Sequence, residues 1–190
     1  MFYAVIQRPE TDTSAITSIS RKYDPYFGLV GPHVSLVFPF KADEVDEDEF
    51  IEHIRDVAGR TKPFEVRLNE LELAWDQWLF LTPSVGKEEI TNLHDELYEG
   101  PLAKFLREDI EFIPHVGLGL FAQEDSEYDL RDPKAIPLDE EKYQAARAEI
   151  EAASLDLQYR AAKLEIISVS EDFKSSETIK VVEFGAKERV

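Results

Sequence analysis

The 190-residue chain contains no cysteine, which excludes disulfides, thiolate nucleophiles and cysteine-ligated metal sites. It has no apolar run near the ~20 residues that a membrane-spanning helix needs. The N-terminal segment, residues 1–9, lacks the basic region of a signal peptide and is typical of a first strand. From these absences we expect a soluble, cytoplasmic protein with no membrane partner.

Positive charge is scarce, because 21 Lys and Arg stand against 40 Asp and Glu, giving a formal charge of −19. A protein that tracks nucleic-acid backbones needs many cations to displace counterions, so extended nucleic-acid binding is not expected. The length suits one domain, and no shift in composition marks a linker. We therefore expect residues 1–190 to form a single domain.

Hydrophobic patterning predicts alternating strands and helices. The order β-α-β-α-β-β-α-β-α-β-β places the chain in the α+β or α/β class. A long polar loop is expected at 122–138, and the helix at 87–106 could break at Gly100-Pro101. Strands are expected at 2–7, 33–38, 64–75, 78–81, 112–121, 155–169 and 178–184, and helices at 11–23, 43–59, 87–106 and 139–153.

An internal repeat stands out from this pattern. The segments GPHVSLVF (31–38) and IPHVGLGL (113–120) share Pro, His, Val and Leu at four aligned positions. Their histidines, His33 and His115, lie 82 residues apart, and each copy follows a strand and a helix. The two halves of the chain are therefore predicted to be related by a pseudo-twofold axis.

The repeat has a simple geometric meaning. Side chains alternate along a strand, so His33 and Ser35 share one face, ~7 Å apart, while Leu36 and Phe38 are expected to face the core. If the two copies face each other, two imidazoles converge on one cleft. Such a pair can act as acid and base near neutral pH, and a serine hydroxyl can donate a hydrogen bond to a phosphate oxygen.

These residues resemble the paired His-x-Ser/Thr-x motifs (HxTx motifs) of the 2H phosphoesterase superfamily, which holds 2′-5′ RNA ligase-like proteins and RNA 2′,3′-cyclic phosphodiesterases. The first copy matches in full, whereas Gly117 replaces the hydroxyl of the second. The resemblance implies a bilobal α+β fold with pseudo-twofold related halves, antiparallel sheets lining a central cleft and helices outside. It also implies metal-free hydrolysis of a 2′,3′-cyclic or related 2′-linked phosphodiester, a step of RNA processing or cyclic-nucleotide turnover.

The resemblance further implies that His33 and His115 are the acid–base pair, with neither role assigned, and that Ser35 and the position of Gly117 meet the phosphate. Tyr26 and Phe27, in the loop before the first motif, are candidates for the cleft rim. Four basic residues that flank the first motif in sequence could form a local positive rim: Arg8, Arg21, Lys22 and Lys41. No metal and no cofactor are expected. The expected partner of this hydrolase is a small nucleotide or a short RNA end with a cyclic phosphate, and we expect a monomer.

Two other readings stay open. Because Gly117 removes one hydroxyl, the chain could be a degenerate module that binds a phosphorylated nucleotide without turnover. Alternatively, its acidic surface could serve interaction with a basic partner. The remaining histidines, His53 and His94, lie beside apolar residues at helical spacing and are expected to be structural.

Overall fold

The computed structural model describes residues 1–123 and 137–185. Most of the loop expected at 122–138 thus lies outside the described residues. The helical elements are α1 (Ser14–Tyr23), α2 (Phe27–Val30), η1 (Ala42–Glu44), α3 (Glu47–Arg60), α4 (Lys87–Leu97), η2 (Gly100–Phe105) and α5 (Glu140–Ala153). The strands are β1 (Phe2–Gln7), β2 (Val34–Lys41), β3 (Phe64–Ala74), β4 (Trp78–Val85), β5 (Val116–Leu120), β6 (Leu157–Ala161), β7 (Lys163–Val169) and β8 (Ser176–Glu183).

The strands form two four-stranded sheets, ordered β2-β1-β7-β8 and β5-β4-β3-β6. Every pairing is antiparallel. The unit β1-α1-β2 in one sheet matches the unit β4-α4-β5 in the other, and each histidine motif enters the strand at the edge of its sheet. The predicted α+β fold with two related halves is confirmed.

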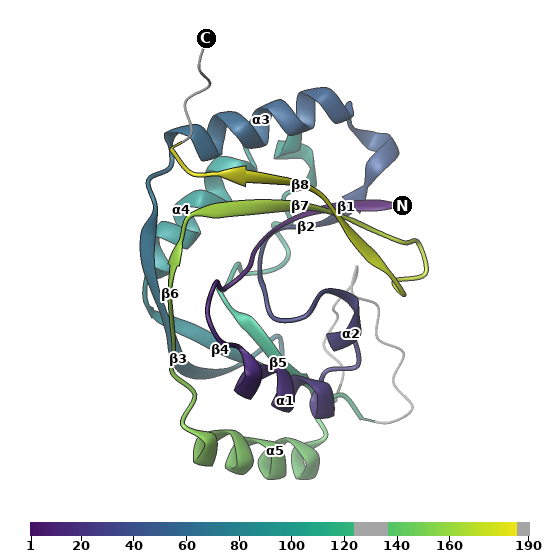
Figure 1. Ribbon diagram of the computed structural model, residues 1–190. Coiled ribbons are helices and arrows are strands. Elements are labelled where there is room, and N and C mark those ends of the chain that lie inside the picture. The colour runs from purple at the N-terminus through teal and green to yellow at the C-terminus, as the bar shows by residue number, and fades with distance from the viewer. Residues whose placement is uncertain (124–136, 186–190) are drawn as a thin grey trace.

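Each sheet carries buried apolar residues on both of its faces. The main core takes Val5 and Leu36 from one sheet and Leu68 and Leu81 from the other, so it joins the two halves. Smaller apolar clusters cover the opposite faces, formed by Phe2, Ala4, Ile6, Ile167 and Val169 in one sheet and by Ala74, Trp78, Phe80 and Leu120 in the other. Figure 1 shows α3 and α4 at the upper end of the molecule, α1 and α5 at the lower end, and α2 on the side away from β3 and β6.

Helix α3 illustrates how the sequence specifies the elements. Its Asp46 cap accepts a hydrogen bond from the Glu49 N–H at 3.0 Å, and three acidic residues in the first turn favour the helix dipole. The apolar stripe predicted for this helix, Phe50, Ile54, Val57 and Ala58, is buried. Helix α5 begins in the same way, with Asp139 accepting from the Lys142 N–H.

Three predicted boundaries were wrong. The single strand expected at 155–169 is two strands, because the chain leaves one sheet at Ala162: β6 pairs with β3, and β7 pairs with β1. The strand expected at 78–81 continues to Val85, and the strand expected at 112–121 begins only at Val116. The break expected at Gly100-Pro101 within the helix at 87–106 is confirmed, because α4 ends at Leu97 and η2 begins at Gly100-Pro101.

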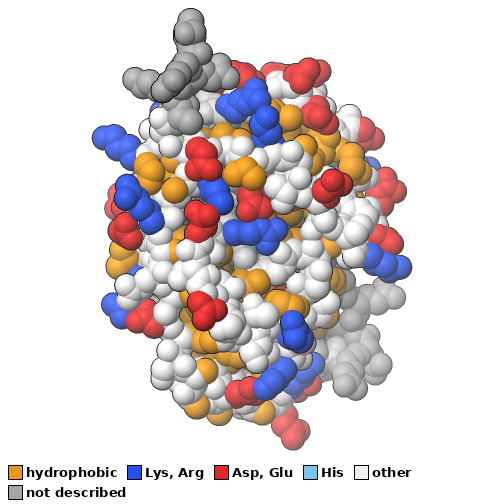
Figure 2. All heavy atoms as spheres, viewed as in Figure 1, with side chains coloured by type: hydrophobic (Ala, Val, Ile, Leu, Met, Phe, Trp, Pro, Cys, Tyr) orange, Lys and Arg blue, Asp and Glu red, His pale blue; other side chains and the backbone are white. Residues whose placement is uncertain are grey.

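The surface shows how the negative charge is distributed. On the face seen in Figure 2, Lys and Arg side chains lie among the Asp and Glu side chains. Within residues 1–123 and 137–185, no helix combines the length and the apolar character needed to cross a bilayer.

Candidate functional site

A cavity of about 500 Å³ separates the two sheets, and both motifs line it. His33 and Ser35 contribute from the first motif, and His115 and Gly117 from the second. Tyr26 and Phe27, expected at the rim, line the same cavity. The structure therefore brings together all six residues singled out from the sequence.

The two histidines are held in the same way. His33 Nδ1 lies 2.7 Å from the Gly31 carbonyl, and His115 Nδ1 lies 2.5 Å from the Ile113 carbonyl, in each case two residues back. A carbonyl only accepts, so each Nδ1 carries the proton and each Nε2 keeps its lone pair. The Ser35 hydroxyl donates a hydrogen bond to His33 Nε2 over an Oγ–Nε2 distance of 3.1 Å. Both imidazoles can therefore exchange a proton through Nε2.

His115 sits among aromatic rings. Phe80 stacks on the imidazole with ring centroids 3.4 Å apart, and Trp75 meets it edge to face at 5.5 Å. The pKa of His115 is lowered to about 4, mainly by loss of water around the imidazole and also by a charge on His33, whereas the hydrogen bond to Ile113 acts in the opposite direction. His115 is therefore neutral at physiological pH and ready to accept a proton.

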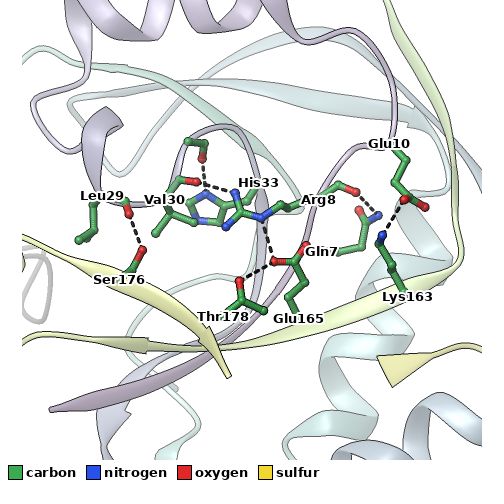
Figure 3. A network of polar contacts seen from close by, with 11 residues as sticks. Gln7, Arg8, Glu10, Leu29, Val30, His33, Lys163, Glu165, Ser176 and Thr178 are labelled. Carbon is green, nitrogen blue, oxygen red and sulfur yellow. Dashed lines mark hydrogen bonds and ion pairs between the residues drawn. The ribbon is translucent and has the colours of Figure 1, made fainter. Parts of the chain in front are cut away.

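Charged neighbours as well as burial affect the pKa of His33. Burial is the largest effect and lowers the pKa of His33, whereas its hydrogen bond to Gly31 raises it. Arg8 lowers the pKa and Glu165 raises it, since one cation and one anion lie behind the imidazole. Figure 3 shows Arg8 and Glu165 joined beside His33.

Gly117 takes an ordinary strand conformation with free space beside it. A Cβ added there would meet only Trp78 Cζ3, at 3.8 Å, so the backbone does not require glycine. The Gly117 carbonyl accepts a hydrogen bond from the buried Ser20 hydroxyl at 3.1 Å. The two motifs thus have the same strand backbone and differ in chemistry, because the second lacks the hydroxyl.

The prediction for Phe38 was wrong. Strand alternation placed its ring in the core, but Phe38 is half-buried and lines the cavity. The pairing of β1 with β2 slips between Ile6/Ser35 and Val5/Val37, so β2 holds an extra residue there, and the consecutive Leu36 and Val37 are both buried in the main core. A bulge reverses the alternation that follows it, which turns Phe38 toward the cavity.

The basic residues near the first motif do not form a common rim. Of the four candidates in the sequence, Lys41 lines the cavity, whereas Arg8 lies behind His33. Arg21 packs over the Phe27 ring, and Lys22 pairs with Glu149. Lys104 and Arg107, which the sequence did not single out, also line the cavity.

Sequence reasoning also missed Asp24, Trp75 and the Arg8–Glu165 pair. Asp24 lines the cavity, and burial raises its pKa to about 6. Glu165 offered a signal, because a carboxylate inside the apolar run 164–167 needs a buried partner. Trp75 offered none, since only the folded hairpin brings its ring to His115.

The described part of the chain contains no cluster of three or more His, Asp or Glu side chains placed to hold a metal ion. The remaining histidines have structural contacts, as predicted from their helical positions. His94 is buried, lies 2.7 Å from the Leu36 carbonyl and stacks on Phe112, and His53 contacts the Leu97 carbonyl.

Comparisons with known proteins agree with this site. The family described as the 2′-5′ RNA ligase superfamily matches residues 8–167. A relative from Geobacillus kaustophilus, named "Putative phosphoesterase", is 25% identical over 116 residues, which is 60% of this chain and 66% of the relative. A relative of the same description from Bacillus licheniformis is 26% identical over 132 residues, 68% of this chain and 77% of its own length. The match to the first of these spans about two thirds of that relative.

Solved structures share the fold. The protein TT0787 of Thermus thermophilus superposes with a TM-score of 0.63 at 13% identity, covering 98% of this chain and 100% of its own. E. coli LigT complexed with 3′-AMP superposes with a TM-score of 0.55 at 14% identity, covering 97% and 99%. The family match and the shared fold agree with the paired motifs, and together they support a phosphoesterase-type activity. The chain belongs to the 2′-5′ RNA ligase superfamily and, with it, to the 2H phosphoesterases.

Proposed function

We propose that the protein is a metal-independent phosphodiesterase that hydrolyses a 2′,3′-cyclic or related 2′-linked phosphodiester on a nucleotide or RNA end. One observation carries the proposal: two equivalent histidines are each fixed through Nδ1 by a backbone carbonyl, and both line one cavity. This leaves two Nε2 atoms for one acid–base reaction.

The surroundings of the two rings favour different roles. His115 is desolvated by Phe80 and Trp75, which favours its neutral form and the role of base. Burial and Arg8 lower the pKa of His33, but the nearby Glu165 carboxylate acts against both, and among the described residues no carboxylate does the same for His115. On this difference we assign the role of acid to His33. Because a charge on His33 disfavours one on His115, at most one of the two imidazoles is charged at a time.

In this reaction, a water oxygen replaces one ribose oxygen on the phosphorus. His115 Nε2 removes a proton from water, whose oxygen forms a new bond to phosphorus. The bond from phosphorus to one ribose oxygen breaks, and that oxygen takes the proton of His33 Nε2. The Ser35 hydroxyl, released from His33 once that nitrogen is protonated, donates to a phosphate oxygen.

The rest of the cavity suits a nucleotide. Tyr26, Phe27, Phe38 and Trp75 offer ring faces or edges to a base, and Lys41, Lys104 and Arg107 favour an anionic ligand. E. coli LigT, of the same fold, is known in complexes with 3′-AMP, ATP and NADP+. This supports a ligand of nucleotide size.

Turnover of 2′,3′-cyclic nucleotides by purified variants tests the proposal. His33→Ala and His115→Ala should each lower kcat/KM by about 10²–10⁴-fold while circular dichroism stays unchanged. His53→Ala is the matched control, because His53 lies outside the cavity lining, and it should retain activity. Equal activity in wild type and both motif variants would refute the assignment, and so would inactivation by a chelator.

Gly117 favours a second candidate function, a module that binds a phosphorylated nucleotide without cleaving it. Loss of one donor to a developing anion can cost ~2.7–4 kcal/mol. Calorimetric titration with a 3′-nucleotide, alongside the turnover assay, separates the two functions. Stoichiometric binding without turnover by the wild-type protein would favour the module.

A further inference from the structure

Three successive carbonyls of the loop that carries His33 accept hydrogen bonds from side chains. The Leu29 carbonyl accepts from the Ser176 hydroxyl, the Val30 carbonyl from Arg8 Nη1 at 2.5 Å, and the Gly31 carbonyl from His33 Nδ1. Ser176 comes from β8, and Arg8 directly follows β1. Figure 3 shows these contacts reaching the loop from the sheet. The orientation of the His33 ring therefore depends on donors outside the motif.

Arg8 is itself held by a buried carboxylate. Its Nε lies 2.9 Å from Glu165 Oε2, and the Thr178 hydroxyl donates to the same oxygen at 3.1 Å. Glu165 is only 8% exposed and stands in β7 between the buried Leu164 and Ile166. A carboxylate in such a position lowers stability unless it is paired, and an apolar residue would fit the strand pattern better.

The pair also sets the charge behind His33. Arg8 faces the imidazole from the end of β1, Glu165 faces it from β7, and His115 faces it from the second motif. Arg8 opposes a proton on His33, and Glu165 favours one. Neither side chain lines the cavity, so any effect on a ligand must pass through His33.

We propose that the Arg8–Glu165 pair is a positioning element for His33: it fixes the carbonyls that orient the imidazole and balances the charge behind it. Its consequence for turnover rests on the proposed function, whereas its consequence for His33 itself does not. Among the described residues, His33 is the one charged group that shifts the pKa of His115. The pair therefore makes the two halves of the repeat chemically unequal.

Nuclear magnetic resonance titration of the His33 imidazole tests this inference without any substrate. The resonance is assigned by its loss in His33→Gln. Arg8→Gln should raise the titration midpoint of His33, because a repelling cation is gone. Glu165→Gln should lower it, because the attracting anion is gone and Arg8 remains. These opposite shifts would support the proposal that the pair balances the charge behind His33.

Arg67→Gln is the matched control. Arg67 forms a two-bonded ion pair with Asp156, both contacts at 2.8 Å, in the sheet that does not carry His33. It should leave the His33 midpoint unchanged. A loosened loop would instead move both Arg8→Gln and Glu165→Gln toward the ordinary histidine value, and that outcome, or no shift at all, would overturn the proposal.

Arg8→Lys separates charge from position and serves if Arg8→Gln does not fold. Lysine keeps the charge but cannot reach Glu165 and the Val30 carbonyl with one fork of donors. The His33 midpoint should stay near that of wild type, while kcat for a 2′,3′-cyclic nucleotide falls at unchanged KM. A wild-type protein that cleaves no such nucleotide would refute the proposed function, and the titration would still decide the role of the pair.

Discussion

The indole of Trp75 meets the imidazole of His115 edge to face, with ring centroids 5.5 Å apart and planes at 88°. Trp75 does so from a left-handed backbone conformation, with φ at 50°, which bulky residues avoid. It also contacts Phe38 of the other sheet, so one strained residue touches both halves of the cavity. Strain of this kind persists where the surrounding structure needs the side chain in that place.

Replacing Trp75 by glycine should raise the pKa of His115 from about 4 toward the ordinary histidine value, because water takes the place of the indole. Glycine accepts the positive φ, so the hairpin should still form. Nuclear magnetic resonance titration of His115 measures the shift.

Asp76→Gly is the control, since Asp76 also has a positive φ, at 67°, but its side chain is exposed. It should stabilise the fold by up to ~1 kcal/mol and leave the His115 pKa unchanged. An unmoved pKa in Trp75→Gly would show that the indole does not shield the ring.

Acid should destabilise the protein partly through His115. In the folded state its pKa is about 4, whereas in the unfolded chain it is ~6.5, so between these values the unfolded state binds more protons. Stability present above pH ~6.5 is lost as the pH falls to ~4, by as much as ~3 kcal/mol. Urea unfolding of wild type and His115→Gln at pH 7.5 and pH 5 measures this effect. The variant should lose less stability on acidification, and an equal loss in both proteins would contradict the lowered pKa.

The repeat explains why much of the site could be predicted from sequence. Local patterns specified β1, α3 and α5, and the two copies of Pro-His-Val predicted that His33 and His115 meet. What local patterns do not contain is pairing between distant segments. The division of 155–169 at Ala162 depends on which sheet each half joins, and the bulge that turns Phe38 depends on the register against β1.

The charged surroundings of the histidines were unpredictable for a similar reason. Arg8 was expected at a positive rim, and the buried Glu165, 157 residues away, draws it behind His33 instead. The apolar run 164–167 indicates that Glu165 is buried and paired, but it does not identify the partner. Only the order β2-β1-β7 places the end of β1 beside β7 and the first motif.

Restoring the missing hydroxyl should increase activity. Gly117→Ser adds a donor at the position that matches Ser35, and the added Cβ has ordinary contact with Trp78. We expect kcat/KM for a 2′,3′-cyclic nucleotide to rise at least ~10-fold, because in other enzymes the loss of one such donor lowers kcat by ~10²–10³-fold. Gly117→Ala adds the Cβ without the hydroxyl and should leave kcat/KM unchanged. An equal rise in both variants would assign the effect to packing.

A steric control lies two residues along the same strand. A Cβ at Gly119 would come within 2.7 Å of Tyr23 Cβ and 2.9 Å of the Phe121 ring. Gly119→Ala should therefore destabilise the fold by about 1–3 kcal/mol, as overpacked sites do. Thermal unfolding of Gly117→Ala and Gly119→Ala compares the two positions, and equal stability would show that the space at Gly117 is not special.

Asp24 should lower stability at neutral pH. Burial raises its pKa to about 6, above the value of the unfolded chain, so the folded state disfavours the ionised carboxylate. The stability that the protonated form contributes is complete below pH ~3.9 and is lost as the pH rises through ~6. Asp24→Asn should therefore stabilise the fold at pH 7.5 by as much as ~3 kcal/mol and have little effect at pH 3.5. The asparagine oxygen can still accept the Tyr26 N–H, which lies 2.8 Å from Asp24 Oδ1.

Asp12→Asn is the matched control for this prediction. Asp12 accepts from the N–H two residues ahead at 2.9 Å, as Asp24 does, but it is exposed, and the hydrogen bonds from Ser14 lower its pKa. Asp12→Asn should not stabilise the protein at pH 7.5.

Because an ionised Asp24 repels a phosphate, we expect the Asp24 carboxylate to contact an uncharged part of the ligand, such as a ribose hydroxyl or a base N–H. Asp24→Asn should then raise KM for a 2′,3′-cyclic nucleotide, and a stabilised variant with unchanged KM and kcat would show that the ligand does not use this carboxylate.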